Sequence, residues 1–334
     1  MNEPIRVVLV GAGVVAEKKH LPALRPLSEF QIVALADPDA ERRSLLADRC
    51  EGAIAKATLE DCLEAVEVDA VAVLTPPSTH IPLVRQALQA GKYVLVEKPL
   101  CLDLEQAQSL LHHPDVSRVL MGFHLRHHRL IERARELLGQ GAVGQVQGFR
   151  GAWCAPRPPD QSDWKNQRIH GGGAQIELAV HFYDLTRHLL RSELQGIQAY
   201  SLSAERDDET TAVVGRTASG VPFSGTFSER ASHQMEFEIY GSRGRIKIDC
   251  LRFDGLELTH WGEDTGSVGS RLRRILQTVR ELPIGIRSYR EGGDYIVSYR
   301  RQWQHFHKVV RGDAPPLCTA ADGLAALLAV KESF

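Results

Sequence analysis

Residues 5–16 constrain the fold most, because they join a buried strand to a glycine turn. Ile5 to Val10 is rich in β-branched and aliphatic residues, as is typical of a parallel strand buried on both faces. The run ends in a G-x-G-x-x-A pattern. Such glycines let the backbone approach a pyrophosphate, which amides at the start of the next helix then bind. The pattern predicts dinucleotide contacts at Gly11, Ala12, Gly13, Val14 and Val15.

An acidic residue follows the second predicted strand. Gln31 to Ala36 reads as a buried strand, and Asp37 comes directly after it, where its carboxylate would accept hydrogen bonds from an adenosine ribose. A glycine turn before an ordinary strand is the alternative, and Asp37 favours the dinucleotide. Asp37 would also repel a 2′-phosphate, which favours NAD. Arg42 and Arg43 follow closely and would offset that repulsion, so NADP stays the alternative cofactor.

Helices and strands alternate up to about residue 122. Such alternation predicts an N-terminal Rossmann domain, a doubly wound parallel sheet over residues 1–122. Further strands are expected at 70–74, 93–96 and 119–123. Helices are expected at 16–28 (interrupted or delayed by Pro22), 39–50, 59–66, 80–90 and 104–111.

The alternation of helices and strands ends after residue 122, and residues 123–334 have a different pattern. A helix at 130–138, a loop at 155–173 and a helix at 175–190 precede six short alternating segments between 197 and 258. This spacing predicts a second α/β domain with a large, mostly antiparallel open sheet. Two closing helices, at 297–311 and 320–333, are expected to pack back on the first domain.

Composition excludes several classes of protein. At 334 residues the chain exceeds the usual size of a single core, and a net charge of -2 offers nucleic acid no global attraction. No apolar run is long enough to span a membrane. Six scattered cysteines without a C-x-x-C pair fit neither a zinc knuckle nor a disulfide framework, which favours reduced thiols and a cytoplasmic location.

The cluster His124, Arg126, His127, His128 and Arg129 matches no zinc spacing. We therefore expect no metal site, and interpret the cluster as a hinge or a substrate-facing surface.

Two strand ends carry polar motifs. Thr75-Pro76-Pro77 and Glu97-Lys98-Pro99 terminate successive buried strands at their carboxyl ends, the edge at which open α/β sheets bind ligands. This places Lys98 toward a cleft, although Glu-Lys-Pro in a solvated turn is the alternative reading.

A glycine run, which we expect to be mobile, leads into the helix at 175–190. Glu177, His181, Asp184 and His188 fall on one stripe of this helix, with apolar residues on its other faces. A solvated polar face is the alternative interpretation. The apolar neighbours favour a stripe that lines a cleft.

A basic segment with helical apolar spacing spans residues 271–290. It would pack on a partner subunit, a membrane surface, an anionic substrate group or the protein's own body, or form a solvated basic face. Its arginines are Arg271, Arg273, Arg274, Arg280, Arg287 and Arg290.

With these pieces in order, the chain resembles the glucose-fructose oxidoreductase / inositol dehydrogenase (Gfo/Idh/MocA) family over nearly its whole length. The motifs that carry the resemblance are Val10 to Gly13, Ala36 to Asp39, Thr75 to His80, Ala90 to Pro99, Gly171 to Asp184 and Gly312 to Pro316.

The resemblance implies sugar-like or cyclitol substrates and an open sheet that forms a homodimer or homotetramer interface. It implies that Lys98 is the active-site lysine, with a cis bond to Pro99, and that His181 is the catalytic histidine. Glu177 stands where the family has aspartate, and His124 where it usually has asparagine. The implied cofactor contacts beyond the glycine turn and Asp37 are Thr75, Pro76, Pro77, His80, Glu97 and Lys98.

The expected activity is hydride transfer between a nicotinamide and a secondary alcohol or ketone of a sugar, nucleotide sugar or cyclitol. Such a reaction needs a group that handles the hydroxyl proton, which Lys98 and His181 would do while Glu177 orients His181. A hydrolase or epimerase that retains its cofactor, and a non-catalytic dinucleotide-binding protein, are the alternatives. Candidate substrate contacts are His124, Arg126, Trp164, Lys165, Arg168 and Asp184.

Overall fold

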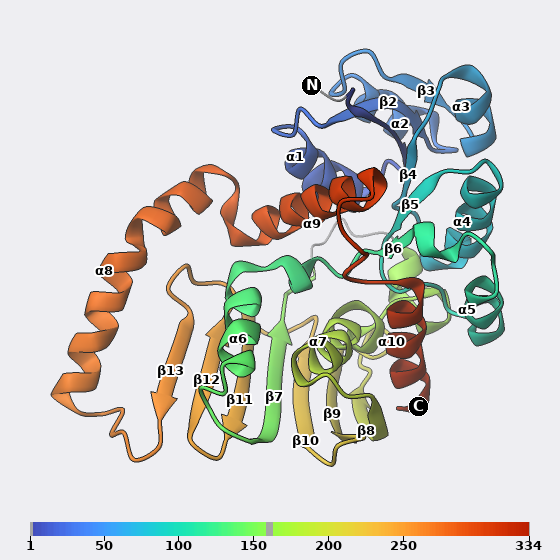
Figure 1. Cartoon of the computed structure of the whole chain (residues 1–334). Helices are drawn as coiled ribbons and strands as arrows, with labels where there is room; N and C mark the ends of the chain where they lie inside the picture. The colour runs from blue at the N-terminus through green and yellow to red at the C-terminus, as the bar shows by residue number, and fades with distance from the viewer. Residues whose placement is uncertain (1–2, 158–162, 334) are drawn as a thin grey trace. The chain divides into compact units, whose positions relative to one another are not determined.

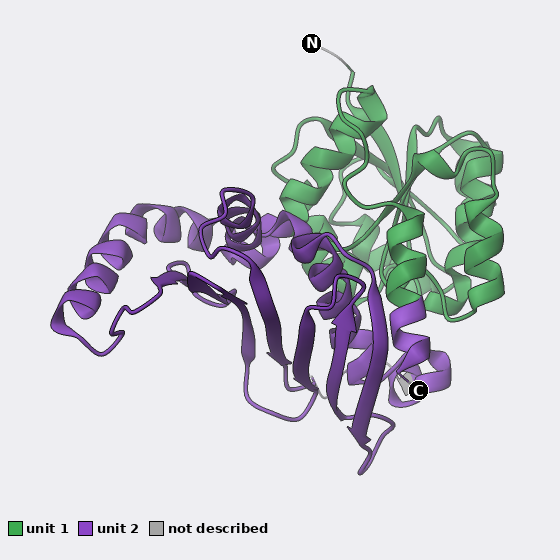
Figure 2. Ribbon diagram, turned by 60° about the horizontal axis from the view of Figure 1, so that its bottom comes forward, with its two compact units in different colours: residues 1–123, 299–327 green, residues 124–298, 328–334 purple. Residues whose placement is uncertain are grey.

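The computed structural model describes residues 3–157 and 163–333, which divide into two units (Figure 2). Met1–Phe123 and Tyr299–Leu327 form unit 1, whereas His124–Ser298 and Leu328–Phe334 form unit 2. No helix among the described residues has both the length and the apolar character needed to cross a membrane.

Unit 1 is built on a six-stranded parallel sheet of order β3-β2-β1-β4-β5-β6, the order of a Rossmann fold, which confirms the predicted fold class. Its central strands are buried on both faces, as their aliphatic sequences predict. The strands are β1 (Ile5–Val10), β2 (Phe30–Ala36), β3 (Ile54–Lys56), β4 (Ala70–Val73), β5 (Tyr93–Val96) and β6 (Val119–Met121).

Helices cover both faces of this sheet (Figure 1). Side chains of Asp39, Thr58 and Asp103 cap α2, α3 and α5 by accepting amides of the first turn. The helical segments are η1 (Ala16–His20), α1 (Leu21–Leu24), α2 (Ala40–Ala47), α3 (Leu59–Ala65), η2 (Pro77–Thr79), α4 (His80–Gln89), α5 (Leu104–Leu111) and η3 (Val116–Arg118).

The predicted helix at 16–28 is shorter and differently wound. Residues 16–20 form a π-helical turn that runs directly into α1, and the chain leaves the helix after Leu24. Pro22 lies in the first turn of α1, where the chain passes from π-helical to α-helical winding.

Two late helices contribute to unit 1. Residues 299–327, from α9 (Gly293–Arg311) and α10 (Ala320–Glu332), belong to this unit. Trp303 of α9 is fully buried against His20 and Phe30. A Cβ at Gly323 of α10 would lie 2.8 Å from Sδ of Met121, so this glycine permits close packing beside β6.

Unit 2 contains a seven-stranded sheet of order β13-β12-β11-β7-β10-β9-β8. Every pairing is antiparallel except that of β10 with β7, which confirms the predicted mostly antiparallel sheet. The strands are β7 (Val146–Cys154), β8 (Leu194–Leu202), β9 (Thr210–Thr217), β10 (Pro222–Ser228), β11 (Gln234–Gly241), β12 (Gly244–Asp249) and β13 (Leu256–His260).

Helices α6 and α7 of unit 2 pack on one face of this sheet (Figure 1). Phe182 of α7 contacts Phe149, Phe227 and Phe237, which form the aromatic core of the unit. The helical segments are η4 (His124–His127), α6 (Arg129–Gly139), η5 (Asp163–Asn166), η6 (Arg168–His170), η7 (Gln175–Ala179), α7 (Val180–Leu190) and α8 (Val268–Arg290).

Candidate active site

The glycine turn after β1 has two glycines with different purposes. Gly11 has a φ of +100°, and a Cβ there would lie 2.7 Å from the carbonyl oxygen of Leu74, so only glycine fits beside the loop after β4. A Cβ at Gly13 would meet nothing within 4 Å. Gly11 therefore permits the turn itself, whereas Gly13 leaves its backbone open to a ligand. Val14 is exposed and Val15 begins the helical turn.

Asp37 fixes this turn. Its Oδ2 accepts the amide of Ala12 at 2.7 Å, and its Oδ1 accepts the amide of Asp39 at 2.9 Å. Each carboxylate oxygen can accept a second hydrogen bond, so Asp37 keeps capacity for a ribose hydroxyl. An open glycine, a helix start and a ribose acceptor at one edge fit a bound dinucleotide.

The neighbouring arginines bind other groups. Nη1 of Arg43 donates to the carbonyl oxygens of Asp37 and Pro38, at 2.9 and 3.2 Å. Arg42 pairs with Asp39 at 3.3 Å. Both guanidinium groups are thus engaged with acceptors other than the Asp37 carboxylate.

His80 links the loops that follow β4 and β5. Its Nε2 lies 2.8 Å from the carbonyl oxygen of Thr75, and its Nδ1 lies 2.9 Å from that of Pro99. Pro77 is buried behind the exposed Pro76. The Lys98–Pro99 bond is cis, as the family resemblance implies, and Lys98 is half-buried at the carboxyl end of β5.

Glu97 lies inside unit 1. Its Oε1 is 2.9 Å from Nε2 of His20, and Nε1 of Trp303 donates to Nδ1 of the same ring at 3.2 Å. Trp303 therefore leaves the proton of His20 on Nε2, facing Glu97. Oε2 of Glu97 accepts the amide of Lys98 at 3.1 Å. Glu97 was expected among the cofactor contacts, and its observed bonds hold the backbone of Lys98.

The strands β1, β4 and β5 are neighbours in the sheet. Their carboxyl ends therefore bring the glycine turn, Thr75 and Lys98 to one edge of unit 1, where ligands of such sheets bind.

The polar stripe of η7 and α7 is largely buried. His181, Asp184 and His188 are 3%, 1% and 9% exposed, and the side chain of Glu177 is 15% exposed. The solvated-face interpretation is therefore wrong. The His181 ring packs against Trp153 of β7, with centroids 5.0 Å apart, and against His124 at 5.4 Å.

Two candidate substrate contacts bind each other. Nη2 of Arg126 lies 2.6 Å from Oδ1 of Asp184, and its Nε lies 2.9 Å from Oδ2, which makes a buried bidentate pair between η4 and α7. His124 bonds Oγ of Ser298 at 2.8 Å and packs on Tyr295.

Glu177 belongs to a cluster of two carboxylates and two cations. Nζ of Lys165 lies 2.6 Å from its Oε2, and Nη1 of Arg157 lies 3.9 Å from Oε2 of Glu229. Burial, and then repulsion by Glu177, raise the pKa of Glu229. Sequence reasoning missed Arg157 and Glu229. They follow β7 and β10, whose parallel pairing places their carboxyl ends at the same edge. That pairing is visible only in the structure, because the sequence did not predict β7.

The remaining candidates lie near this cluster in sequence. Nζ of Lys165 sits 5.2 Å from the centroid of the Trp164 ring, a cation–π distance. The amide of Arg168 donates to Asp207 at 3.0 Å.

Packing explains the glycine run. A Cβ at Gly172 would lie 1.9 Å from the carbonyl oxygen of Lys165, and Gly173 has a φ of +92° beside Asp208. Gly172 permits the close approach of the Lys165 backbone, and Gly173 permits a left-handed backbone. Packing is thus the reason for these glycines, whereas we expected mobility.

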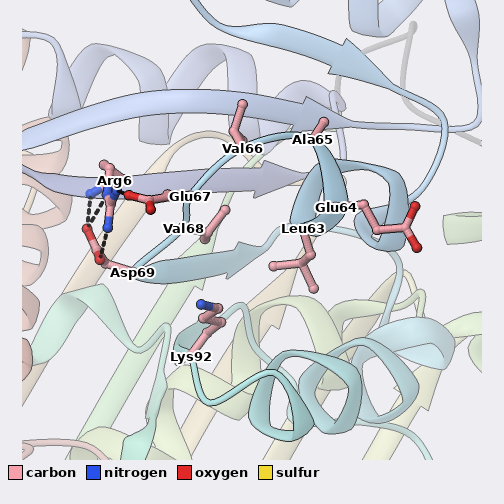
Figure 3. Close-up of a pocket in the computed structure, with 9 residues that line it drawn as sticks. All are labelled: Arg6, Leu63, Glu64, Ala65, Val66, Glu67, Val68, Asp69 and Lys92. Atoms are coloured by element: carbon pink, nitrogen blue, oxygen red, sulfur yellow. Dashed lines mark hydrogen bonds and ion pairs between the residues drawn. The ribbon is translucent and has the colours of Figure 1, made fainter.

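A polar hollow in unit 1 lies at the other edge of the sheet (Figure 3). It surrounds the starts of β1, β4 and β5, where Arg6 binds both Asp69 and Glu67. Ligands of doubly wound sheets bind at the carboxyl ends, so this hollow is separate from the candidate site. Among residues 3–157 and 163–333, no three His, Cys, Asp or Glu side chains are grouped to hold a metal ion.

Two family models match the chain. Residues 5–121 match an oxidoreductase family with an NAD-binding Rossmann fold, and residues 131–247 match the Gfo/Idh/MocA C-terminal domain. A dTDP-3,4-didehydro-2,6-dideoxy-alpha-D-glucose 3-reductase of Actinomadura kijaniata is 31% identical over 250 residues, 73% of this chain and 74% of that protein.

Other similar proteins span nearly the whole chain. The myo-inositol 2-dehydrogenase of Thermotoga maritima is 26% identical over 335 residues, 97% of this chain and 93% of its own length. The WlbA dehydrogenase of Bordetella pertussis, solved with NADH and UDP-GlcNAcA, superposes with a TM-score of 0.82 at 20% identity, covering 100% of this chain and 96% of that one. The chain is an NAD(P)-dependent oxidoreductase and belongs to the Gfo/Idh/MocA family.

Proposed function

We propose that the protein transfers hydride between NAD and a secondary alcohol or ketone carbon of a sugar, nucleotide sugar or cyclitol. The position of Lys98 carries this proposal: it follows the carboxyl end of β5, beside the strands whose ends hold Thr75 and the glycine turn. The related proteins named above support the substrate class, because one reduces a nucleotide sugar and another oxidises inositol.

Bound NAD would supply the hydride acceptor. The chain must then handle the hydroxyl proton, and we assign this to Lys98 and His181. His181 suits general acid–base work because an imidazole nitrogen can both accept and donate a proton. Glu177, which we expected to orient His181, pairs with Lys165, and we assign both side chains to positioning the substrate hydroxyls.

The cluster around Glu177 suits a sugar or cyclitol ring. Lys165 and Arg157 donate hydrogen bonds, and Glu177 and Glu229 accept them, so the four groups can bind hydroxyls, which both donate and accept. Lys165 and Arg157 are balanced by the two carboxylates, and Arg206, a third cation that acts on Glu229, pairs with Glu209. This part of unit 2 therefore favours the polyol portion of a substrate over a phosphate.

Asp37 favours NAD over NADP, since Arg42 and Arg43 are engaged elsewhere. Asp37→Ser should weaken NAD binding and improve NADP binding relative to it, as measured by fluorescence titration of both reduced cofactors. Asp48→Ser, at an exposed carboxylate after α2, is the matched control. An unchanged NAD-to-NADP ratio in Asp37→Ser would contradict this role.

Lys98→Ala tests the catalytic assignment. We expect turnover across a panel of sugars, nucleotide sugars and cyclitols to fall by about a hundredfold to ten-thousandfold, with NADH binding nearly unchanged. Lys92→Ala removes a lysine from the hollow at the opposite edge of the sheet and should keep full activity. Full activity in Lys98→Ala would contradict a catalytic role for Lys98.

We also propose that the chain acts as a cytoplasmic homodimer or homotetramer through the open face of the unit 2 sheet. Tyr200, Leu202 and Val214 are exposed on that face, and all six cysteines are buried as free thiols. Light scattering of Tyr200→Lys/Val214→Lys should show smaller particles than the parent protein. An unchanged particle mass would argue against this interface.

A further inference from the structure

Helix α8 packs on unit 2 through its polar face and exposes its apolar face, the reverse of an ordinary surface helix. The covered residues are Ser270, Gln277, Thr278, Glu281, Gly285 and Ser288. The exposed set, which we name the α8 stripe, is 46% to 74% exposed and consists of Val268, Leu272, Ile275, Val279, Leu282 and Ile286.

Specific contacts fix this orientation. Nε2 of Gln277 donates to the carbonyl oxygen of Leu256 in β13 at 2.5 Å, and Glu281 pairs with Arg129 at 3.1 Å. A Cβ at Gly285 would lie 2.6 Å from the ring of Phe253, so the helix can approach this closely only with glycine there. Figure 1 shows α8 beside β13, at the edge of the sheet. The outward apolar face is therefore built into the packing.

Arginines flank the α8 stripe. At the helical 100° per residue, Arg280 and Arg287 lie on one side of it and Arg271 on the other. Arg271, Arg280 and Arg290 have no ion pair within the part of the chain that the structure describes. The helix holds six arginines and one glutamate. Three of the arginines, Arg273, Arg274 and Arg287, pair with carboxylates outside the helix. The surplus positive charge beside the stripe therefore comes from Arg271, Arg280 and Arg290.

This charge argues against a second copy as the occupant. Two α8 helices paired antiparallel would set arginine rows against each other, because Glu281 faces the body of unit 2. On the open face of the sheet, Glu238 already pairs with Arg150 and Arg245. Glu236 pairs there with Lys247. An anionic lipid surface would bind both the arginines and the stripe. Its phosphates would pair with the guanidinium groups, and its acyl boundary would cover the apolar side chains.

We propose that α8 binds an anionic lipid bilayer as an interfacial helix, with its stripe in the acyl boundary and its arginines among the headgroups. The helix would lie in the plane of the surface without crossing it. The enzyme would thereby be held at a membrane.

Flotation of the full-length protein with vesicles tests this. The protein should float with vesicles of equal phosphatidylglycerol and phosphatidylcholine and not with phosphatidylcholine alone. Arg271→Glu/Arg280→Glu/Arg290→Glu should weaken binding by roughly a hundredfold, since each arginine contributes about fivefold near an anionic surface.

The stripe needs its own variant and control. Leu272→Ser/Ile275→Ser/Val279→Ser should abolish flotation, whereas Leu45→Ser/Leu251→Ser/Leu328→Ser, which changes exposed leucines elsewhere, should float like the parent. Equal flotation of the stripe variant and the parent would overturn the proposal. The proposal would also be overturned if the parent protein never floats and the stripe variant has a smaller particle mass than the parent. That result would mean that a second copy of the chain covers the stripe.

Discussion

Lys165 and Glu177 form an ion pair with 2.6 Å between Nζ and Oε2, and this pair lies next to a second carboxylate, Glu229. Repulsion between the two carboxylates is limited only while the cations stay in place. Lys165 itself holds down the pKa of Glu229. The lysine therefore controls both the geometry and the charge of the candidate sugar site.

Lys165→Met should raise the pKa of Glu229 further, because a cation that favours its ionised form is lost. We expect the acid limb of the pH–rate profile to move to higher pH and KM for the sugar to rise about tenfold. Steady-state kinetics across pH measures both. Lys165→Arg keeps the charge and should keep the profile near that of the parent, and a profile that shifts equally in both variants would contradict the charge argument.

Glu229→Gln should change how stability depends on pH. A carboxyl whose pKa is raised by folding binds its proton more tightly in the folded chain, so its contribution is present in acid and lost as pH rises through the raised pKa. The variant cannot lose that contribution. Its free energy of unfolding, relative to the parent, should therefore improve from acid to neutral pH in urea titrations, and a constant difference would refute the raised pKa.

The two turn glycines should separate folding from binding. Gly11→Ala should lower the free energy of unfolding by about 2 kcal/mol or more, because the backbone is left-handed and Leu74 is too close. Gly13→Ala should change it by no more than about 0.5 kcal/mol, since its Cβ meets open space. NAD affinity should nevertheless fall in Gly13→Ala. Unchanged titrations with NADH in that variant would show that no ligand approaches Gly13.

The buried pair Arg126–Asp184 should be costly to break on one side only. Arg126→Leu leaves the buried Asp184 carboxylate without the guanidinium group that neutralises it, which costs about 3–5 kcal/mol in unfolding free energy. Arg126→Leu/Asp184→Leu should recover most of that loss, because no charge then remains buried. Urea denaturation of both variants measures the two free energies of unfolding. A double variant no more stable than Arg126→Leu would contradict the view that the cost comes from a buried charge without its counter-charge.

Much of unit 1 could be predicted locally. Strands 5–10 and 93–96 have the predicted bounds because apolar runs between turn residues leave few alternatives. Strand β3 was missed because it has only three residues. β7 was missed although it is central in its sheet: Gly148 and Gly151 weaken its pattern, and Gly151 is needed because Phe182 packs where a Cβ would lie.

The sequence by itself determined the doubly wound parallel sheet, the glycine turn with Asp37 and the edge that carries Lys98. Those features follow from short segments, in which side-chain period and backbone freedom are local properties. Only the tertiary structure decided which charges meet. Lys165 pairs with Glu177, and Arg126 pairs with Asp184. Helix α8 turns its apolar face outward because its polar face packs against Phe253 and against backbone and side-chain groups that are distant in sequence. Spacing along one chain cannot show such partners, since they come from strands and helices that only packing brings together.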